Sequence, residues 1–135
     1  RLDEVQAAIL NYKLLKLNSD INKRRRIAKI YYDNIKCGGL ILPRENDKNF
    51  HSYYVFVVRH KKRKEIMNYL KKKKIFCNIS YPYPIHNMKG YKNLFSGVKN
   101  LEITEKLSKD IFSLPMYPEL NDTKLEKIIS IINKF

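Results

Sequence analysis

A run of six residues, Tyr53 to Val58, constrains the fold of this chain most, because each of them is aromatic or β-branched. Such a run is typical of a strand, and its lack of polar alternation predicts a central strand covered on both faces. The mostly apolar run Ile75 to Ile79 predicts a second strand. Between the two, residues 62–73 repeat apolar side chains at helical spacing. This connecting helix leaves two arrangements open, a parallel crossover or a return to an antiparallel neighbour.

Two helices are predicted before the first strand. Apolar side chains recur at i, i+3, i+4 and i+7 through residues 3–17, which is the spacing of an amphipathic helix. Residues 18–20 (Asn-Ser-Asp) prefer caps and turns, so we expect them to interrupt that helix. A second helix follows over residues 21–35, and Gly38 and Gly39 end it.

Two more helices are predicted in the last third of the chain, with an extended segment over residues 111–118 between them. The first helix, Leu101 to Asp110, is expected to turn four residues inward: Leu101, Thr104, Leu107 and Ile111. Asn121 or Asp122 caps the second. Its predicted apolar face is Leu125, Ile128, Ile129 and Ile132.

These elements predict an α+β fold, a small and mostly antiparallel sheet packed with helices and preceded by a long N-terminal helical arm. A chain of 135 residues has the length of one domain, and its apolar content of 44% supplies a core. We expect residues 1–37 to form the arm and residues 38–135 the sheet-and-helix body.

Basic residues outnumber acidic ones by 28 to 13, which leaves a formal charge of +15. They concentrate in three runs, Lys23–Arg26, Arg59–Lys64 and Lys71–Lys74. These runs form either a surface that binds polyanions or ordinary solvated helix faces. The sequence contains no RNP aromatic pattern, GXXG loop or zinc knuckle, so we expect no specific nucleic-acid site. A basic module that engages nucleic acid or an anionic surface is the alternative function.

The sequence also bears on location. It shows no signal-peptide pattern, and its longest apolar run is too short to cross a bilayer, so we expect no membrane contact. Cys37 and Cys77 lie far apart without CxxC spacing. We interpret them as small buried hydrophobic residues of a cytoplasmic protein.

Catalytic motifs are scarce. His51, His60 and His86 lack metal-ligand spacing, and no Walker loop, GxGxxG or GxSxG motif occurs. No catalytic or metal-binding residue is therefore predicted. His60 lies in a basic turn and is expected to be solvated, whereas His51 precedes the strand and terminates it.

The segment from Tyr81 to His86 is the best candidate for a binding site. Its two prolines remove backbone donors and fix φ, which predicts a stiff extended segment that is neither a helix nor part of a sheet. Tyr81 and Tyr83 alternate and so share a side, where they are either half-buried aromatic residues or ligand contacts. His86 is either a ligand contact or a structural histidine.

Five stretches, in order along nearly the whole chain, resemble the motifs of the DegT/StrS-type sugar-nucleotide aminotransferases. They are Arg1–Leu10, Asn22–Arg26, His51–Arg59, Tyr81–His86 and Ser113–Leu120. The third is similar to the family's His-x-Tyr-x-x-Phe-x-x-Arg strand, and the last to its Ser-Leu-Pro-Met-x-Pro signature. Ser80 departs from the pattern, because the family usually has histidine before the tyrosine, and the resemblance therefore leaves the sugar open.

The resemblance implies the C-terminal small domain of a fold type I enzyme that uses pyridoxal 5'-phosphate. Such enzymes are homodimers that move an amino group, usually from glutamate, onto a keto-sugar nucleotide, most often for polysaccharide or glycan decoration. In the family the large domain supplies the Schiff-base lysine and the phosphate cradle. That domain is not part of this sequence, so no cofactor-binding residue is assigned and the chain alone is expected to be inactive.

The resemblance also implies three substrate contacts. Arg1 matches a motif arginine that reaches the neighbouring subunit's active site, where a guanidinium suits the phosphates of a nucleotide-sugar. Tyr81 and His86 match the segment that lines the sugar pocket, and they offer a hydroxyl and an imidazole to sugar hydroxyls or pyrophosphate. The first helix is expected to expose apolar residues and to drive self-association.

Overall fold

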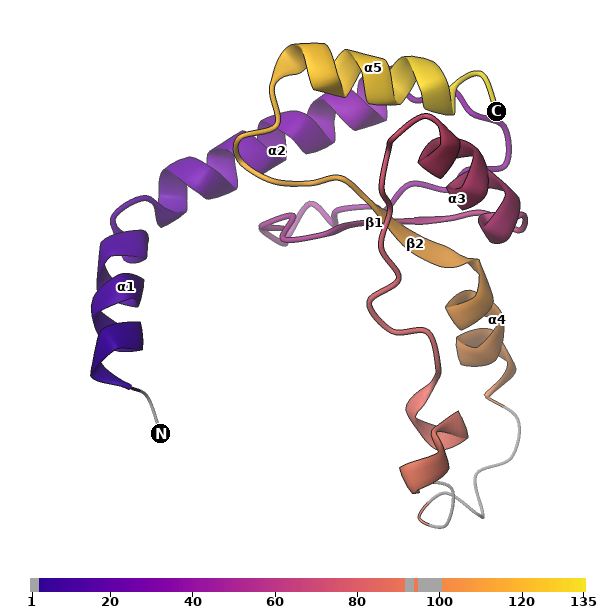
Figure 1. Cartoon of the computed structure of the whole chain (residues 1–135), viewed down its shortest axis with the longest axis horizontal. Helices are drawn as coiled ribbons and strands as arrows, with labels where there is room; N and C mark the ends of the chain where they lie inside the picture. Colours follow the sequence, from indigo (N-terminus) through magenta and orange to yellow (C-terminus); the bar gives the residue numbers. More distant parts are fainter. Residues whose placement is uncertain (1–2, 92–93, 95–100) are drawn as a thin grey trace.

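The computed structural model describes residues 3–91, 94 and 101–135, and it is mostly helical around a two-stranded sheet (Figure 1). In chain order the elements are α1 (Glu4–Leu14), α2 (Leu17–Asn34), β1 (Phe56–Arg59), α3 (Arg63–Lys72), the short 3-10 turns η1 (Ile85–Asn87) and η2 (Lys89–Tyr91), α4 (Glu102–Asp110), β2 (Ile111–Leu114) and α5 (Asp122–Ile132). The predicted class, with a small antiparallel sheet behind N-terminal helices, is confirmed. Among the described residues no helix is both long and apolar enough to span a bilayer.

The antiparallel neighbour of β1 is β2, which lies far along the chain. Their register runs from Phe56 opposite Leu114 to Arg59 opposite Ile111. Single bridges extend the sheet on either side, Ile41 with Arg59 and Asn78 with Ser113. The sheet is therefore narrow, and its two strands come from the middle and the last third of the chain.

The strand predicted over residues 53–58 is shorter than expected. The prediction that both of its faces are covered was wrong. Tyr53 has a φ of 48°, in the left-handed region, and the strand starts only at Phe56. Phe56 and Val58 are buried, whereas Val57 between them is half-buried and Tyr54 is exposed. This alternation indicates a sheet with one well-covered face, which is the face toward the helices.

The strand predicted over residues 75–79 was also wrong apart from one residue. Behind α3, Lys74 has a φ of 62° and turns the chain, and the Ile75 N–H bonds back to the Leu70 carbonyl at 2.9 Å. Of this described stretch, only Asn78 joins the sheet, through hydrogen bonds of 3.2 and 2.8 Å with Ser113. The hydrogen-bonded turn that ends α3 thus outweighs the strand propensity of residues 75–79.

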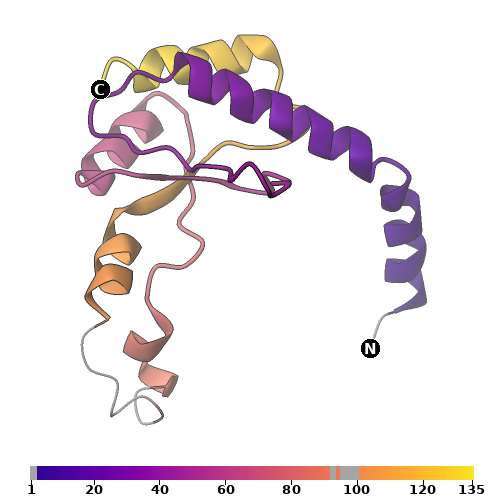
Figure 2. The same ribbon diagram turned by 180° about the vertical axis from the view of Figure 1, so that it is seen from behind.

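The core lies between the sheet and the paired helices α2 and α5, with α3 beside it (Figures 1 and 2). Tyr31, Phe56 and Phe112 are its largest fully buried side chains. The Tyr31 ring lies 5.0 Å from the Phe56 ring, and its hydroxyl donates to the Pro115 carbonyl at 2.8 Å. The prediction for α5 is confirmed, since Asn121 caps it and its buried residues are Leu125, Ile128, Ile129 and Ile132.

The break between the two N-terminal helices lies earlier in the chain than predicted. α1 ends at Leu14 and α2 begins at Leu17, so residues 18–20 lie in the first turns of α2 instead of interrupting the arm. Asp20 suits this place because the helix dipole stabilises a carboxylate near an N-terminus. The second half of α2 joins the core, whereas α1 buries none of its residues. Apolar side chains lie on several sides of α1 rather than along the single predicted face.

The inward face predicted for α4 was wrong. Leu101 and Thr104 are exposed, Leu107 and Ile111 are half-buried, and Ser108 is the buried residue of the helix. The reason is that α4 projects from the body together with residues 79–91, away from α2 and α5 (Figures 1 and 2). Only its end next to β2 is covered by the core.

Candidate functional site

The segment from Tyr81 to His86 lies on the projection beside α4. Pro84 keeps it extended, with φ −60° and ψ 146°, but the next three residues form the 3-10 turn η1, which contains His86. The Asn87 N–H closes this turn on the Pro84 carbonyl at 3.0 Å. The expectation of an extended segment throughout was therefore wrong at His86. The prolines do not prevent the turn because Pro84 precedes it and contributes only its carbonyl oxygen.

His86 is held by a carboxylate from α4. Its Nε2 lies 3.1 Å from Oε1 of Glu105, and its side chain is only 12% exposed. This hydrogen bond is the main reason that the pKa of Glu105 lies below its ordinary value. The pair fastens the proline-rich segment to α4 and fixes the imidazole.

Of the three residues expected to contact substrate, the structure describes Tyr81 and His86. Arg1 lies outside the described residues. Tyr81 is 75% exposed and Tyr83 65%, which excludes the interpretation as half-buried aromatic residues. Both tyrosines are thus open to contact with a ligand or with another part of the protein.

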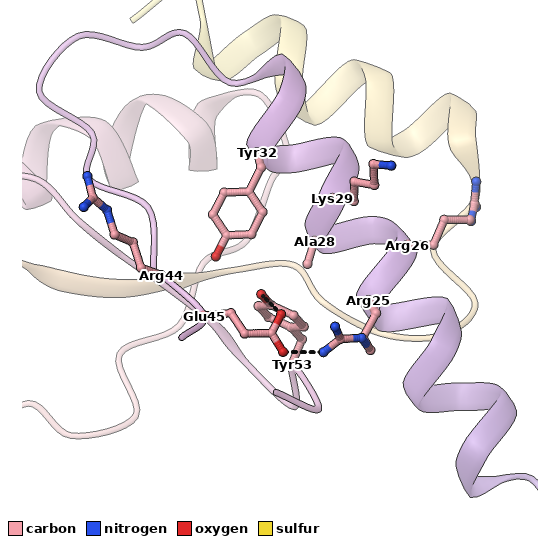
Figure 3. A pocket seen from close by; sticks show the side chains of 8 residues that line it. All are labelled: Arg25, Arg26, Ala28, Lys29, Tyr32, Arg44, Glu45 and Tyr53. Carbon is pink, nitrogen blue, oxygen red and sulfur yellow. Dashed lines mark hydrogen bonds and ion pairs between the residues drawn. The ribbon is translucent and has the colours of Figure 1, made fainter. Parts of the chain in front are cut away.

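A concave site that was not foreseen from the sequence lies between α2 and the loop that precedes β1. It is a recess of about 740 Å³, and its lining residues are Arg25, Arg26, Ala28, Lys29, Tyr32, Arg44, Glu45 and Tyr53. In Figure 3 the side chains of Arg25 and Tyr53 both point at Glu45. The Arg25 Nη1 lies 2.6 Å from Glu45 Oε1, and the Tyr53 hydroxyl donates to Oε2 at 3.2 Å.

Arg25 is the centre of this recess. Its guanidinium also donates to the His51 carbonyl at 2.7 Å and lies over the Phe50 ring, 4.4 Å from its centroid. Glu45 in turn accepts the His51 N–H at 2.7 Å. These contacts hold the loop 45–53 in place and stabilise the left-handed Tyr53. The recess offers a basic rim and aromatic walls, but its carboxylate is already committed to the ion pair.

Glu45 makes the recess sensitive to acid. The Arg25 hydrogen bond and then the His51 N–H lower the pKa of Glu45 from 4.5 to about 2. Because this folded-state pKa lies below the ordinary value, the charged carboxylate stabilises the fold above pH 4.5 and loses that contribution as pH falls toward 2.

We expect Glu45→Gln to reduce the loss of stability between pH 4.5 and pH 2, measured as the free energy of unfolding in urea titrations. Glu105 and Asp122 also have lowered pKa values, so part of the acid dependence remains. Glu119→Gln, at an exposed carboxylate, is the matched control, and an equal change in both variants contradicts the assignment.

The other histidines have structural roles. His60 is buried, which contradicts its expected solvation. Its Nδ1 accepts the Lys62 N–H at 3.0 Å, its ring packs edge-on against Phe135, and Gly39, at a φ of 77°, leaves room for it. The exposed His51 accepts the Tyr53 N–H at 2.9 Å, at the place where the chain turns into β1.

The cysteines and the acidic side chains add no further reactive centre to the described residues. Cys37 and Cys77 are both free and partly buried, and burial raises the pKa of Cys77 to about 12. A thiol with so high a pKa is a poor nucleophile. Across residues 3–91, 94 and 101–135 no three His, Cys, Asp or Glu side chains gather into a metal-binding group.

Comparisons with known proteins agree along the whole chain. A family model described as the DegT/DnrJ/EryC1/StrS aminotransferase family matches residues 1–133. The chain is 42% identical to a dTDP-3-amino-3,4,6-trideoxy-alpha-D-glucose transaminase of Micromonospora megalomicea subsp. nigra, over 99% of this chain and 37% of that protein. It is 36% identical to a dTDP-3-amino-3,6-dideoxy-alpha-D-galactopyranose transaminase of Aneurinibacillus thermoaerophilus, over 100% of this chain and 37% of that protein.

Solved structures show the same fold. The chain superposes on a DegT DnrJ EryC1 StrS aminotransferase from Brucella abortus with a TM-score of 0.90 and 30% identity, covering 100% of this chain and 36% of that one. For S. venezuelae DesV in complex with a ketimine intermediate, the TM-score is 0.93 at 27% identity, over 99% of this chain and 36% of that one. The chain thus spans little more than a third of the length of its relatives.

Proposed function

The chain belongs to the DegT/DnrJ/EryC1/StrS aminotransferase family, and we propose that it is the small domain of an enzyme that moves an amino group onto a keto-sugar nucleotide. The observation that carries the proposal is the match over residues 1–133, with relatives that are transaminases of dTDP-linked sugars. The amino donor we propose is glutamate. The chain would contribute substrate recognition and dimer contacts rather than the transfer step.

The family depends on pyridoxal 5'-phosphate, and the described part of this chain does not fit the role of holding it. A Schiff-base lysine has to be enclosed beside the cofactor, which supplies the electron sink for amino transfer. Every lysine of the described residues is exposed. We therefore propose that the cofactor site lies in a large domain, and no step is assigned to these lysines.

The substrate contacts that we propose are Arg1, Tyr81 and His86. A guanidinium at Arg1 binds phosphate oxygens in a bidentate way, which suits the pyrophosphate of a sugar nucleotide. The exposed Tyr81 offers a hydroxyl that both donates and accepts. His86 offers an imidazole whose orientation is fixed by Glu105.

We propose a homodimer for the intact enzyme, with α1 at a contact surface. This helix buries none of its residues, although most of its side chains are apolar. An exposed apolar surface of this kind marks a place where another protein surface docks.

The test of the proposed function uses the chain and the full-length protein in parallel. We expect the 135-residue chain to show neither a Schiff-base absorbance band with pyridoxal 5'-phosphate nor a borohydride-trapped adduct at a single lysine. The full-length protein is expected to show both, and to transfer the amino group of glutamate to a dTDP-linked keto-sugar. A single-site adduct on the short chain, or a full-length protein inactive on every nucleotide-linked keto-sugar, overturns the proposal.

A further inference from the structure

Glu105 is the one carboxylate of the described residues that hydrogen-bonds a histidine ring, at 3.1 Å between its Oε1 and Nε2 of His86. It is itself held in α4, where its N–H bonds to the Leu101 carbonyl at 2.9 Å and its carbonyl accepts the Ser108 hydroxyl at 2.8 Å. The His86 ring is therefore attached to a fixed point of a helix and not only to its own short turn.

The chemistry of the pair decides which ring nitrogen carries the proton. The hydrogen bond from His86, with help from Asn87 and Lys109, lowers the pKa of Glu105, so the side chain is an anion near neutral pH. An ionised carboxylate only accepts hydrogen bonds. Nε2 of His86 must then be the donor, and in the neutral ring Nδ1 is left as an acceptor.

Nδ1 of His86 is the ring nitrogen that Glu105 does not bond. It has no hydrogen-bond partner among the described residues, where Arg24 Nε is the one enclosed side-chain nitrogen or oxygen without a partner. The His86 side chain keeps 12% of its surface exposed. An acceptor nitrogen matches a hydroxyl, which has a hydrogen to give, and does not match the bare oxygens of a pyrophosphate.

We propose that Glu105 is a positioning residue that holds His86 with Nε2 protonated, so that Nδ1 accepts a hydrogen bond from a sugar hydroxyl of the substrate. The inference rests on the proposed function, in which His86 contacts the sugar of a nucleotide-linked substrate. It goes beyond that function by naming the group that controls His86 and by assigning His86 to the sugar rather than to the phosphates.

A double-mutant cycle in the full-length protein tests this, with dTDP-glucose and dTDP as the two probes in calorimetric binding. Glu105→Ala and His86→Ala are each expected to weaken dTDP-glucose about tenfold, the loss of one good hydrogen bond, and to leave dTDP unchanged. The double variant is expected to bind like His86→Ala, because Glu105 acts only through that ring. Glu105→Gln, which keeps an acceptor oxygen, is expected to retain most of the affinity, and Glu102→Ala on the same helix is the control.

The outcomes separate the two proposals. Additive losses in the cycle, or an equal loss of dTDP and dTDP-glucose, overturn the positioning role and leave the transaminase proposal intact. If Glu105→Ala does not fold, the comparison passes to Glu105→Gln and Glu105→Asp, where only the aspartate, one methylene shorter, is expected to lose the sugar-dependent affinity. A full-length protein without transaminase activity on any nucleotide sugar overturns the proposed function and this inference with it.

Discussion

Phe56→Ala is expected to remove a large part of the free energy of unfolding of the chain. Phe56 is completely buried at the start of β1, and its ring contacts the rings of Tyr31, Tyr32 and Tyr53 at centroid distances of 5.0, 5.6 and 6.1 Å. Truncating a buried phenylalanine costs about 3–5 kcal/mol, because the apolar contacts are lost and a cavity remains. A domain of this size has a free energy of unfolding of about 5–15 kcal/mol, so one substitution removes much of it.

The neighbouring residue of the same strand provides the control. Val57 is only half-buried, on the opposite side of β1, and Val57→Ala is expected to cost roughly 1 kcal/mol. Urea unfolding followed by circular dichroism gives both values. Equal losses in the two variants would show that Phe56 is not the centre of the core. Phe56→Leu is expected to lie between them, because it fills part of the same space.

The parts of the fold that the sequence predicts well are those decided by local pattern. α5 shows this most clearly, because its cap at Asn121 and its buried face at i, i+3 and i+4 lie within one short stretch. β1 shows the limit. The composition of residues 53–58 is that of a strand, but the hydrogen bond from Tyr53 to Glu45 and the contacts of Arg25 hold Tyr53 in a left-handed conformation. No local sequence pattern predicts these contacts, because Arg25 and Glu45 lie 20 residues apart.

In the candidate site, too, local pattern predicts some features and long-range contacts decide the rest. The prolines around Tyr83 predict a stiff segment, and the resemblance of this segment to a family motif singles out His86. Glu105 could not be identified from the sequence because it lies 19 residues away in a helix whose polar side gives no separate signal. Its contact with His86 is apparent only in the structure, where η1 packs against α4. The functional residues that sequence reasoning misses here are those that orient other residues.

α1 exposes apolar side chains that the described part of the chain leaves uncovered. At 100° per residue, its apolar side chains fall into two stripes separated by polar residues. The broader stripe consists of Val5, Ala8, Ile9 and Tyr12 and continues to Leu15, the residue that caps the helix, and the narrower one consists of Ala7, Leu10 and Leu14. All of the large residues among them are between 48% and 82% exposed. A helix that is apolar on more than one side is normally buried between neighbours, so we expect each stripe to meet a different surface.

Adding charge to the broader stripe is expected to abolish self-association of the 135-residue chain. In sedimentation velocity the unmodified chain should associate with rising concentration. Ile9→Lys with Tyr12→Lys should weaken the association about 1,000-fold, because two central apolar contacts are each worth about 2 kcal/mol. Gln6→Lys with Asn11→Lys adds the same charge on the polar strips of α1 and should leave association nearly unchanged. Circular dichroism confirms that the helix content is equal in both. A wild-type chain that remains monomeric at its solubility limit, or equal weakening by both pairs, contradicts a dimer contact on this stripe. Contact with the proposed large domain is then the explanation for the exposed stripe.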